Sequence, residues 1–496
     1  MSLFDMKIVL VNSSVKRGLA YGLNDGMPKG LMDYLGGYQP LGICYIASVL
    51  RENGFRNLFL IDAEAENLSI REVADKVKLF SPDIVGISSM SFSFLYALDL
   101  AKTIKAILPN SLIVIGGSHV DLYPKQVLTH NCFDVGVIGE GEYTFLELIQ
   151  LFCQDRYTFK DGLKKIDGIV FRNESDIVLT HQRKVIKELD NLPFPARDLL
   201  DLSNYKQNYL PNPFISLFTS RGCPYNCTYC CKASWNRYIR TQSAKYVVAE
   251  IEHCMKRYNA RSFQFFDDTF TIQKIRVLEI CRMICERKLN IKFLVLTRVD
   301  KVDREILEWL KKAGCDCISF GVESGDQKIL DKMEKGYNIE QIKRAFLLCK
   351  EIGINIVAYF LLGHPDETIQ SIQNTINLIK ETEPDWCKAN ILTLYPGSPL
   401  YKELLEQGRI RDFWGEMTLD GKAFMSPNIS QNFTMEQLGN FRNKINLMPY
   451  FRKKTNLLNL KKLRNPSNVI WSLQWFKMCL FNKIKNGYSK NNKNFR

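Results

Sequence analysis

Short apolar runs rich in β-branched residues alternate with segments of helical periodicity along the first third of this 496-residue chain. Continuous apolar runs of this kind are typical of strands that are buried on both faces. The connections between the runs are long enough for helical crossovers, which parallel strands require. We therefore predict a doubly wound parallel α/β sheet over residues 1–153, with strands at 7–11, 57–62, 83–88, 111–117 and 134–140.

The predicted strands end in small, polar and glycine-rich turns. Ligands of open α/β sheets bind beyond the carboxyl ends of the strands, and glycine lets the backbone approach a large ligand closely. A dinucleotide site is disfavoured, because no GxGxxG motif follows the first strand. Each turn taken alone is equally compatible with an ordinary tight turn. The candidate binding residues at these strand ends are Ser88, Gly116, Gly117, His119, Gly139 and Glu140.

A cluster of cysteines follows the predicted strand 214–220, in the segment RGCPYNCTYCC at residues 221–231. Cys223, Cys227 and Cys230 have CxxxCxxC spacing, and three thiolates can bind three irons of a [4Fe–4S] cube while the fourth iron stays open. A structural zinc site needs four closed ligands, usually as two CxxC pairs, and no second pair follows. Cys231 is poorly placed to share a metal with its neighbour Cys230, so we interpret it as a packing residue.

Six β/α units, counting the strand before the cysteines, follow one another over residues 210–402. Polar residues at the carboxyl ends of such strands are the usual place for chemistry in α/β enzymes. For any single residue the alternative is a helix cap or a surface carboxylate. The residues that end these strands include Asp267, Asp268, Arg298, Glu323, Ser324 and Gly363.

The cysteine triplet, with Tyr229 before its last cysteine, resembles the signature of the radical S-adenosylmethionine (SAM) superfamily. The six β/α units match the open partial (β/α)6 barrel of that family. The segments PLGICYIASVLRENG, IGGSH and VIGEGE resemble the cobalamin-binding domain that precedes the barrel in some members, so the resemblance covers about residues 5–400. It implies a [4Fe–4S] cluster on Cys223, Cys227 and Cys230, with SAM bound at the open iron and cleaved to a 5′-deoxyadenosyl radical.

The resemblance also implies roles for the strand-end residues. The SAM-binding set that it implies is Tyr229, Asp267, Asp268, Arg298, Glu323, Ser324 and Gly363, with the amino group at the two aspartates, the ribose at Glu323 and Ser324, and adenine beside Gly363. An arginine such as Arg298 can pair with a carboxylate through two hydrogen bonds. The strand-end residues of the N-terminal sheet become the cobalamin set. Because the chain has no DxHxxG motif, the implied cobalamin has no protein imidazole below its cobalt, and His119 is either a wall of the corrin pocket or an exposed turn residue.

Two further segments complete the predicted domain organisation: a linker with a hairpin at 154–209, and a basic, mainly helical C-terminal region at 403–496. The formal net charge of +14 belongs largely to the end of this region, since residues 452–496 contain no Asp or Glu. The apolar segment 469–481, with Trp471 and Trp475 one helical turn apart, suits a membrane interface or a helix packed on the barrel. No run approaches the roughly 20 apolar residues of a membrane span, and the N-terminus does not resemble a signal peptide. We expect a cytoplasmic protein, with peripheral contact at the inner membrane face if the interface interpretation holds.

The function implied by the resemblance is methylation of an unactivated carbon in a lipid or secondary metabolite by a cobalamin-dependent radical SAM enzyme. The alternative with the same domains is a cyclase or rearrangement enzyme that transfers no methyl group. An RNA methylthiotransferase is disfavoured, since the first predicted strand ends in Asn12-Ser13-Ser14 without the cysteines of a second cluster. A non-catalytic zinc- or RNA-binding protein is the remaining reading. The implied partners are a small-molecule or lipid substrate and an electron donor such as flavodoxin or ferredoxin, with nucleic acid disfavoured.

Overall fold

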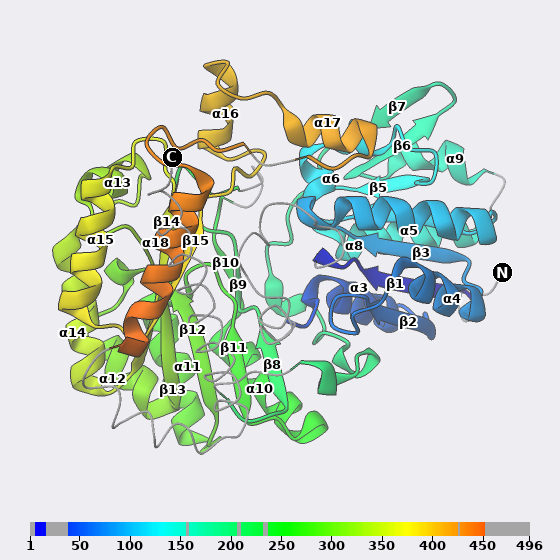
Figure 1. The fold of residues 1–496 in the computed structure, drawn as a ribbon. Helices are drawn as coiled ribbons and strands as arrows, with labels where there is room; N and C mark the ends of the chain where they lie inside the picture. The colour runs from blue at the N-terminus through cyan, green and yellow to red at the C-terminus, as the bar shows by residue number, and fades with distance from the viewer. Residues whose placement is uncertain are drawn as a thin grey trace.

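The computed structural model describes residues 5–15, 38–154, 158–205, 210–231, 237–424 and 427–451. Its two large sheets lie side by side, one built from the N-terminal part of the chain and one from the middle (Figure 1). The predicted fold class is therefore confirmed: a parallel α/β sheet, a six-stranded parallel sheet of the barrel type, and helices that follow them.

The N-terminal sheet has seven strands in the order β2-β1-β3-β4-β5-β6-β7. Its first five strands are parallel, and the hairpin β6–β7 extends the sheet in antiparallel fashion beyond β5. The register pairs Asn12 with both Asp62 and Ser88, and Ser88 with Gly116, so the carboxyl ends of four strands meet at one edge. The strands are β1 (Lys7–Asn12), β2 (Asn57–Asp62), β3 (Ile84–Ser88), β4 (Leu112–Gly116), β5 (Val135–Val137), β6 (Ile169–Asn173) and β7 (Asp176–Leu179).

Helices cover both faces of this sheet, as a doubly wound fold requires. One face packs Ile8 and Leu10 against α3 (Leu41–Glu52) and α8 (Gly141–Gln154). The other face packs Val9 and Val11 against α4 (Ile70–Phe80) and α5 (Phe94–Ile107). Alternate residues of β1 thus enter two separate cores, because successive side chains of a strand point to opposite faces. Shorter helices follow at α6 (Ser118–Leu122), α7 (Pro124–Val127) and α9 (Phe159–Gly162).

The second sheet has six parallel strands in the order β15-β14-β13-β12-β11-β8. A two-stranded ribbon of β9 (Ser220–Arg221) and β10 (Arg240–Thr241) follows β8. The strands of the sheet are β8 (Phe214–Leu217), β11 (Ser262–Phe265), β12 (Lys292–Thr297), β13 (Cys315–Glu323), β14 (Asn355–Leu362) and β15 (Trp386–Ile391). The helices between them are α10 (Ala244–Tyr258), α11 (Lys274–Glu286), α12 (Arg304–Ala313), α13 (Gln327–Lys332), α14 (Ile339–Ile352) and α15 (Ile369–Thr382).

Side-chain caps define where the barrel helices begin. Ser243 accepts a hydrogen bond from the backbone N–H of Tyr246, and Asp303 accepts one from Ile306. Asn338 and Thr368 form capping boxes at α14 and α15. Such caps satisfy the free N–H groups of a first turn. The strand-end residues before the caps are consequently left in loops on one side of the sheet.

The chain after the barrel returns to the N-terminal domain. Of α16 (Pro399–Glu406), α17 (Phe413–Asp420) and α18 (Met435–Leu447), α17 (orange) lies beside α6 of the N-terminal domain in Figure 1. Trp414 of α17 packs edge-on against Phe92 with ring centroids 5.2 Å apart. Tyr123 donates a hydrogen bond of 2.6 Å to Asp412, just before α17. The two halves of the molecule therefore share one core along this segment.

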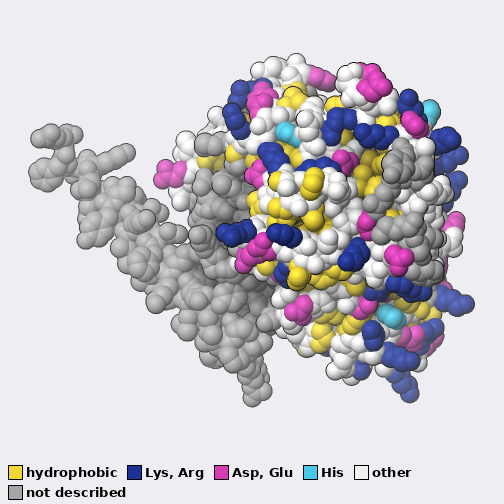
Figure 2. All heavy atoms as spheres, turned by 90° about the vertical axis from the view of Figure 1, so that its right-hand side faces the viewer, with side chains coloured by type: hydrophobic (Ala, Val, Ile, Leu, Met, Phe, Trp, Pro, Cys, Tyr) yellow, Lys and Arg dark blue, Asp and Glu magenta, His cyan; other side chains and the backbone are white. Residues whose placement is uncertain are grey.

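No helix within the described ranges is long and apolar enough to cross a membrane. The basic segment 452–496, with Trp471 and Trp475 and the predicted interface segment 469–481, lies outside the described residues. On the face shown in Figure 2, Lys and Arg side chains are interspersed with Asp and Glu. The described part of that face thus carries both signs of charge.

Candidate functional site

Two cavities lie near the boundary between the two sheets. We call the first the interface cavity: it has a volume of about 350 Å³ and is lined by residues of both the N-terminal domain and the barrel. The second, the cysteine cavity, has a volume of about 520 Å³ and is lined by the cysteine loop and the inner faces of the barrel strands. Asp268, three residues after β11, lines both cavities. The two cavities therefore adjoin at this carboxylate.

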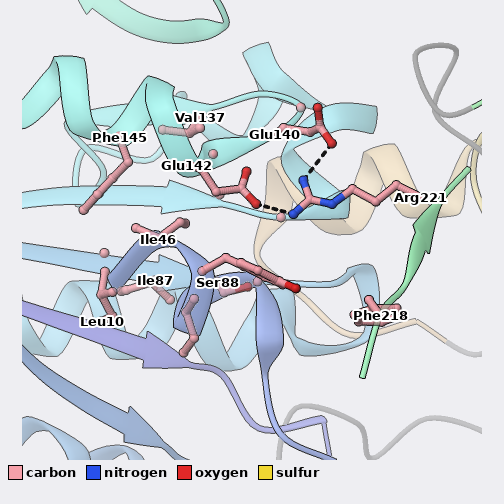
Figure 3. A pocket seen from close by; sticks show the side chains of 18 of the residues that line it. Leu10, Ile46, Ile87, Ser88, Val137, Glu140, Glu142, Phe145, Phe218 and Arg221 are labelled. Atoms are coloured by element: carbon pink, nitrogen blue, oxygen red, sulfur yellow. Dashed lines mark hydrogen bonds and ion pairs between the residues drawn. The ribbon is translucent and has the colours of Figure 1, made fainter. Parts of the chain in front are cut away.

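The deep part of the interface cavity is apolar. Leu10 and Val137 of the sheet face Ile46 of α3 and Phe145 of α8 across it (Figure 3). Gly86 of β3 lets Leu10 and Phe145 lie close against the strand, since a Cβ there would stand 2.8 Å from Leu10 Cδ2 and 3.1 Å from Phe145 Cζ. We call this apolar part of the cavity, which is lined from the sheet and from two helices, the apolar slot.

The rim of the interface cavity is formed by the strand ends that the sequence pointed to. The predicted residues that line it are Ser88, Gly116, Gly117, Gly139 and Glu140. Gly117 has a φ of +101°, and a Cβ there would stand 2.4 Å from the backbone oxygen of Ser89, so only glycine fits. The rim also carries Glu142 and, from the barrel side, Arg221, which forms ion pairs with both glutamates (Figure 3).

The three predicted cluster cysteines line the cysteine cavity together. Cys223 and Cys227 are buried, and Cys230 is partly buried. Within the described ranges, no three His, Cys, Asp or Glu side chains converge closely enough to hold a single metal ion. The thiolates that bind a [4Fe–4S] cube lie further apart than the ligands of a single ion, because each thiolate binds a different iron.

A buried polar network forms another wall of the cysteine cavity. Tyr229 donates a hydrogen bond of 2.8 Å to Glu323 Oε1, and Lys335 Nζ lies 3.1 Å from both that oxygen and the Tyr229 hydroxyl. Burial opposes the charge of Lys335, yet Glu323 holds the lysine pKa above its ordinary value. Glu323 has a φ of +65°, an unfavourable conformation for a residue with a side chain. The backbone of Glu323 is thus strained, and its carboxylate is held at the cavity wall by Tyr229 and Lys335.

Arg298 offers an unused donor to the same cavity. Its guanidinium stacks on Tyr225 at 3.7 Å from the ring centroid, and Nε donates to Asp300 at 2.8 Å. A further donor, Nη2, bonds the backbone oxygen of Lys335. The remaining Nη1 is buried with no hydrogen-bond partner in the part of the chain that the structure describes. A buried unsatisfied donor is costly, and a carboxylate of a ligand would satisfy it.

Three residues of the predicted SAM set lie outside the lining of both cavities. Asp267 is fully buried and accepts hydrogen bonds from the backbone N–H groups of Thr219 (2.6 Å) and Ser220 (3.2 Å), which fixes the start of the cysteine loop. The Ser324 hydroxyl accepts from Asp326 N at 3.1 Å. Gly363 donates its N–H to Glu367 at 2.5 Å. Tyr229, Asp268, Arg298 and Glu323 are the members that line the cysteine cavity.

His119 lies in the core of the N-terminal domain, away from the interface cavity. Its Nδ1 is 3.1 Å from Ser91 Oγ, and its Nε2 is 3.0 Å from Thr418 Oγ1 in α17. Since the Thr418 hydroxyl donates to Trp414 O at 2.7 Å, it accepts from His119, which assigns the proton to Nε2. Burial lowers the pKa of His119 to about 3, so the ring is neutral. The residue joins α17 to the N-terminal domain.

We expect His119→Gln to flatten the acid dependence of stability. Because the folded-state pKa of about 3 is below the ordinary 6.5, the unfolded chain binds the proton first as the pH falls. The stabilisation is complete above pH 6.5 and is lost towards pH 3, by up to about 1.4 kcal/mol per pH unit. Denaturant unfolding across this range should give a smaller slope for the variant, while His181→Gln, at an exposed position, should keep the wild-type slope. Equal slopes for all three proteins would contradict the buried neutral imidazole.

Sequence reasoning missed Lys335 and Arg221. Lys335 follows α13 in a loop, where lysines are usually exposed, but it is buried beside Tyr229 and Glu323. Arg221 adjoins the cysteines, but its two carboxylate partners are about eighty residues earlier in the chain. The signals available were the lysine before Gly336 and the two glutamates of VIGEGE, neither of which identifies a partner.

The chain is similar to several known proteins. The sequence model of the radical SAM superfamily matches residues 217–379, and that of the B12 binding domain matches residues 31–149. An uncharacterized methyltransferase of Pyrococcus horikoshii is 32% identical over 420 residues, which cover 84% of this chain and 88% of that protein. The anaerobic magnesium-protoporphyrin IX monomethyl ester cyclase of Cereibacter sphaeroides is 29% identical over 389 residues, 77% of this chain and 63% of that protein.

A solved structure shares the fold. The radical SAM methyltransferase TsrM of Kitasatospora setae, with tryptophan and a SAM analogue bound, superposes with a TM-score of 0.65 at 18% identity and covers 81% of this chain and 76% of that one. A second structure of TsrM, with cobalamin and a [4Fe–4S] cluster bound, gives a TM-score of 0.63 at 19% identity over 82% of this chain and 75% of that one.

Proposed function

The chain belongs to the B12-binding radical SAM superfamily, and from this we propose that it methylates an unactivated carbon of a lipid or secondary metabolite. The cofactors of this family are a [4Fe–4S] cluster, SAM and cobalamin. The observation that supports methyl transfer is the shared wall at Asp268, because a methyl group that passes between two cofactors requires adjoining sites. The cofactors supply a 5′-deoxyadenosyl radical and a carrier for the methyl group.

The cysteine cavity is proposed to hold the cluster and SAM. Cys223, Cys227 and Cys230 bind three irons, and the free Nη1 of Arg298 receives the SAM carboxylate. Glu323 accepts hydrogen bonds from the ribose hydroxyls, for which Lys335 and Tyr229 hold it in place. These residues bind and orient SAM against the open iron; a reducing one-electron donor such as flavodoxin or ferredoxin is also required.

The interface cavity is proposed to hold cobalamin. Its glycine-rich rim would allow the corrin to approach the backbone, and the apolar slot would receive an apolar part of the ligand. No histidine is among the described residues that line this cavity, and His119 is engaged by Ser91 and Thr418 instead. The residues present therefore fit a cobalamin without a protein imidazole below its cobalt.

The products released from SAM test this proposal before any substrate is known. Protein loaded with cluster and hydroxocobalamin, and given SAM and a strong reductant without oxygen, should form both S-adenosylhomocysteine and 5′-deoxyadenosine. The first product records a methyl group that leaves SAM, and the second records reductive cleavage. Omission of cobalamin should remove only S-adenosylhomocysteine. Absence of S-adenosylhomocysteine from the fully loaded protein would overturn methyl transfer, and absence of both products would overturn radical SAM chemistry as well.

A ring-forming reaction without methyl transfer is the second candidate, favoured by the similarity to a cyclase over 77% of the chain. It uses the same radical chemistry at the cysteine cavity. In that case the loaded protein should form 5′-deoxyadenosine and no S-adenosylhomocysteine. The ratio of the two products therefore separates the candidates.

A further inference from the structure

A buried charge cluster joins the two walls of the interface cavity, one from the N-terminal domain and one from the barrel. The Arg221 guanidinium bridges two carboxylates of the N-terminal domain, with Nη1 2.7 Å from Glu140 Oε1 and Nη2 2.6 Å from Glu142 Oε1 (Figure 3). Arg240 reaches the other oxygen of Glu140 at 2.8 Å. The backbone N–H of Ile186 donates to that same oxygen at 2.7 Å. We call Arg221, Glu140, Glu142 and Arg240 the bridge.

The bridge is too well buried to be an ordinary surface ion pair. The side chains of Glu140 and Glu142 are 6% and 5% exposed, and those of Arg240 and Arg221 are 9% and 20% exposed. Burial opposes ionisation of Glu140, but Arg240 and Arg221 hold its pKa below the ordinary value, so it stays charged. Removing one member of such a group leaves a buried charge without a partner, which is strongly destabilising. The bridge therefore favours one relative position of the two walls.

The bridge spans the interface cavity, and the cysteine cavity begins two residues after Arg221, at Cys223. Glu140 and Glu142 lie in the rim of the interface cavity, together with Gly139 and Gly141. Arg221 is held in the β9–β10 ribbon and precedes Cys223 by two residues, so its position sets where the cysteine loop begins. A ligand in the interface cavity contacts Gly139–Glu142 on one side and Ser220–Gly222 on the other. It therefore packs against both walls only when the bridge is formed.

We propose that the bridge couples the two cofactor sites, so that occupancy of the interface cavity tightens SAM binding at the cysteine loop, with Arg221 as the positioning residue. A ligand that contacts both walls of the interface cavity stabilises the state in which the bridge is formed over states in which the two walls are apart. When the bridge is formed, it holds Arg221 in place. Because Gly222 connects Arg221 to Cys223, it also restricts the position of the first cluster cysteine. Coupling of this kind is reciprocal, so SAM must tighten the binding of cobalamin by the same factor. The inference rests on the proposed assignment of the two cavities.

The test measures SAM affinity with the interface cavity loaded and empty. Cluster-reconstituted full-length protein is titrated with SAM under anaerobic conditions, without reductant, in the presence and absence of saturating hydroxocobalamin. For the wild type we expect the dissociation constant of SAM to fall at least about fivefold when hydroxocobalamin is present. Arg221→Met should bring this ratio close to one. Arg221→Lys keeps the charge but cannot span two carboxylates, so it should restore only part of the coupling.

Two further variants separate coupling from folding. Glu142→Gln removes one arm of the bridge with little change of shape and should weaken the coupling even if Arg221→Met does not fold. Arg304→Met is the matched control, because Arg304 also contacts two glutamates, Glu308 and Glu351, at an exposed site on the barrel that lines neither cavity. It should keep the wild-type ratio.

The outcomes distinguish this inference from the proposed function. Wild-type protein that fails to bind hydroxocobalamin or SAM contradicts the proposed function itself. Wild-type protein that binds both, but with one SAM affinity in either condition, overturns the coupling alone. Wild-type coupling that persists in folded Arg221→Met and Glu142→Gln proteins would mean that the ligands communicate without the bridge, and overturns the role of Arg221.

Discussion

Cys227→Ala is expected to abolish reductive cleavage of SAM. A cube held by three thiolates loses one of its ligands, and Cys227 is a buried cysteine whose negative charge helps to raise the pKa values of Arg298 and Lys335. Anaerobic reconstitution should leave far less than the wild-type iron and acid-labile sulfide per chain. Formation of 5′-deoxyadenosine under reduction should fall to background.

The matched control is Cys231→Ala, four residues further on. Cys231 contributes a sulfur near Gly397 and does not line the cysteine cavity, and burial raises the pKa of its thiol. This variant should keep the iron content and the cleavage activity of the wild type. If Cys227→Ala still cleaved SAM while Cys231→Ala did not, Cys231 would replace Cys227 in the set of cluster ligands.

Gly86→Val is expected to block cobalamin binding. The first side-chain atom alone would stand 2.8 Å from Leu10 and 3.1 Å from Phe145, and both of those side chains already line the apolar slot. If overpacking of roughly 1–3 kcal/mol has to be relieved before cobalamin binds, the affinity for hydroxocobalamin should fall about 5- to 100-fold. Valine suits a strand, which keeps the sheet itself intact. The measurement is a titration followed by the visible absorbance of bound cobalamin.

Gly136→Ala serves as the control for stability. A Cβ at Gly136 in β5 would stand 2.6 Å from Val170 and 3.0 Å from Leu128, and Gly136 does not line the interface cavity. It should lower the unfolding temperature and leave the cobalamin affinity unchanged. A Gly86→Val protein that is folded and binds cobalamin as tightly as the wild type would show that the corrin or its tail does not use this slot.

The strand ends were predictable from sequence because parallel topology forces them to one edge. Buried apolar runs located the strands, and once Asn12, Ser88 and Gly116 are in register, their neighbours must share a site. The cysteine spacing likewise needed no partner from elsewhere in the chain. Both features can be recognised within a short stretch of sequence. The parallel topology then brings the strand ends together.

The adjacent residues Asp267 and Asp268 show what the local sequence does not predict, namely which of the two lines a cavity. Both residues follow the end of β11 at Phe265, where the chain turns, and their carboxylates have different surroundings. Asp267 is used to fix the backbone at Thr219 and Ser220, and Asp268 reaches both cavities. Which of the two faced inward depended on the loop after β11, which no periodicity in the sequence describes.

The surroundings of His119 and Arg221 could not be predicted from the sequence for a different reason. The partners of His119 include Thr418, almost three hundred residues later, and those of Arg221 lie in another domain. The return of α17 to the N-terminal domain, and the extension of the sheet by β6 and β7, are long-range pairings of the same kind. Such contacts decide which polar residues are structural and which remain for a ligand.

Electron paramagnetic resonance of the doubly loaded protein tests most directly whether the two cofactor sites adjoin at Asp268. With the cobalt and the cluster both in paramagnetic states, the two spins should interact, and each spectrum should be split or broadened relative to protein that carries one cofactor alone. Full occupancy of both cofactors with two unperturbed spectra would contradict adjoining sites.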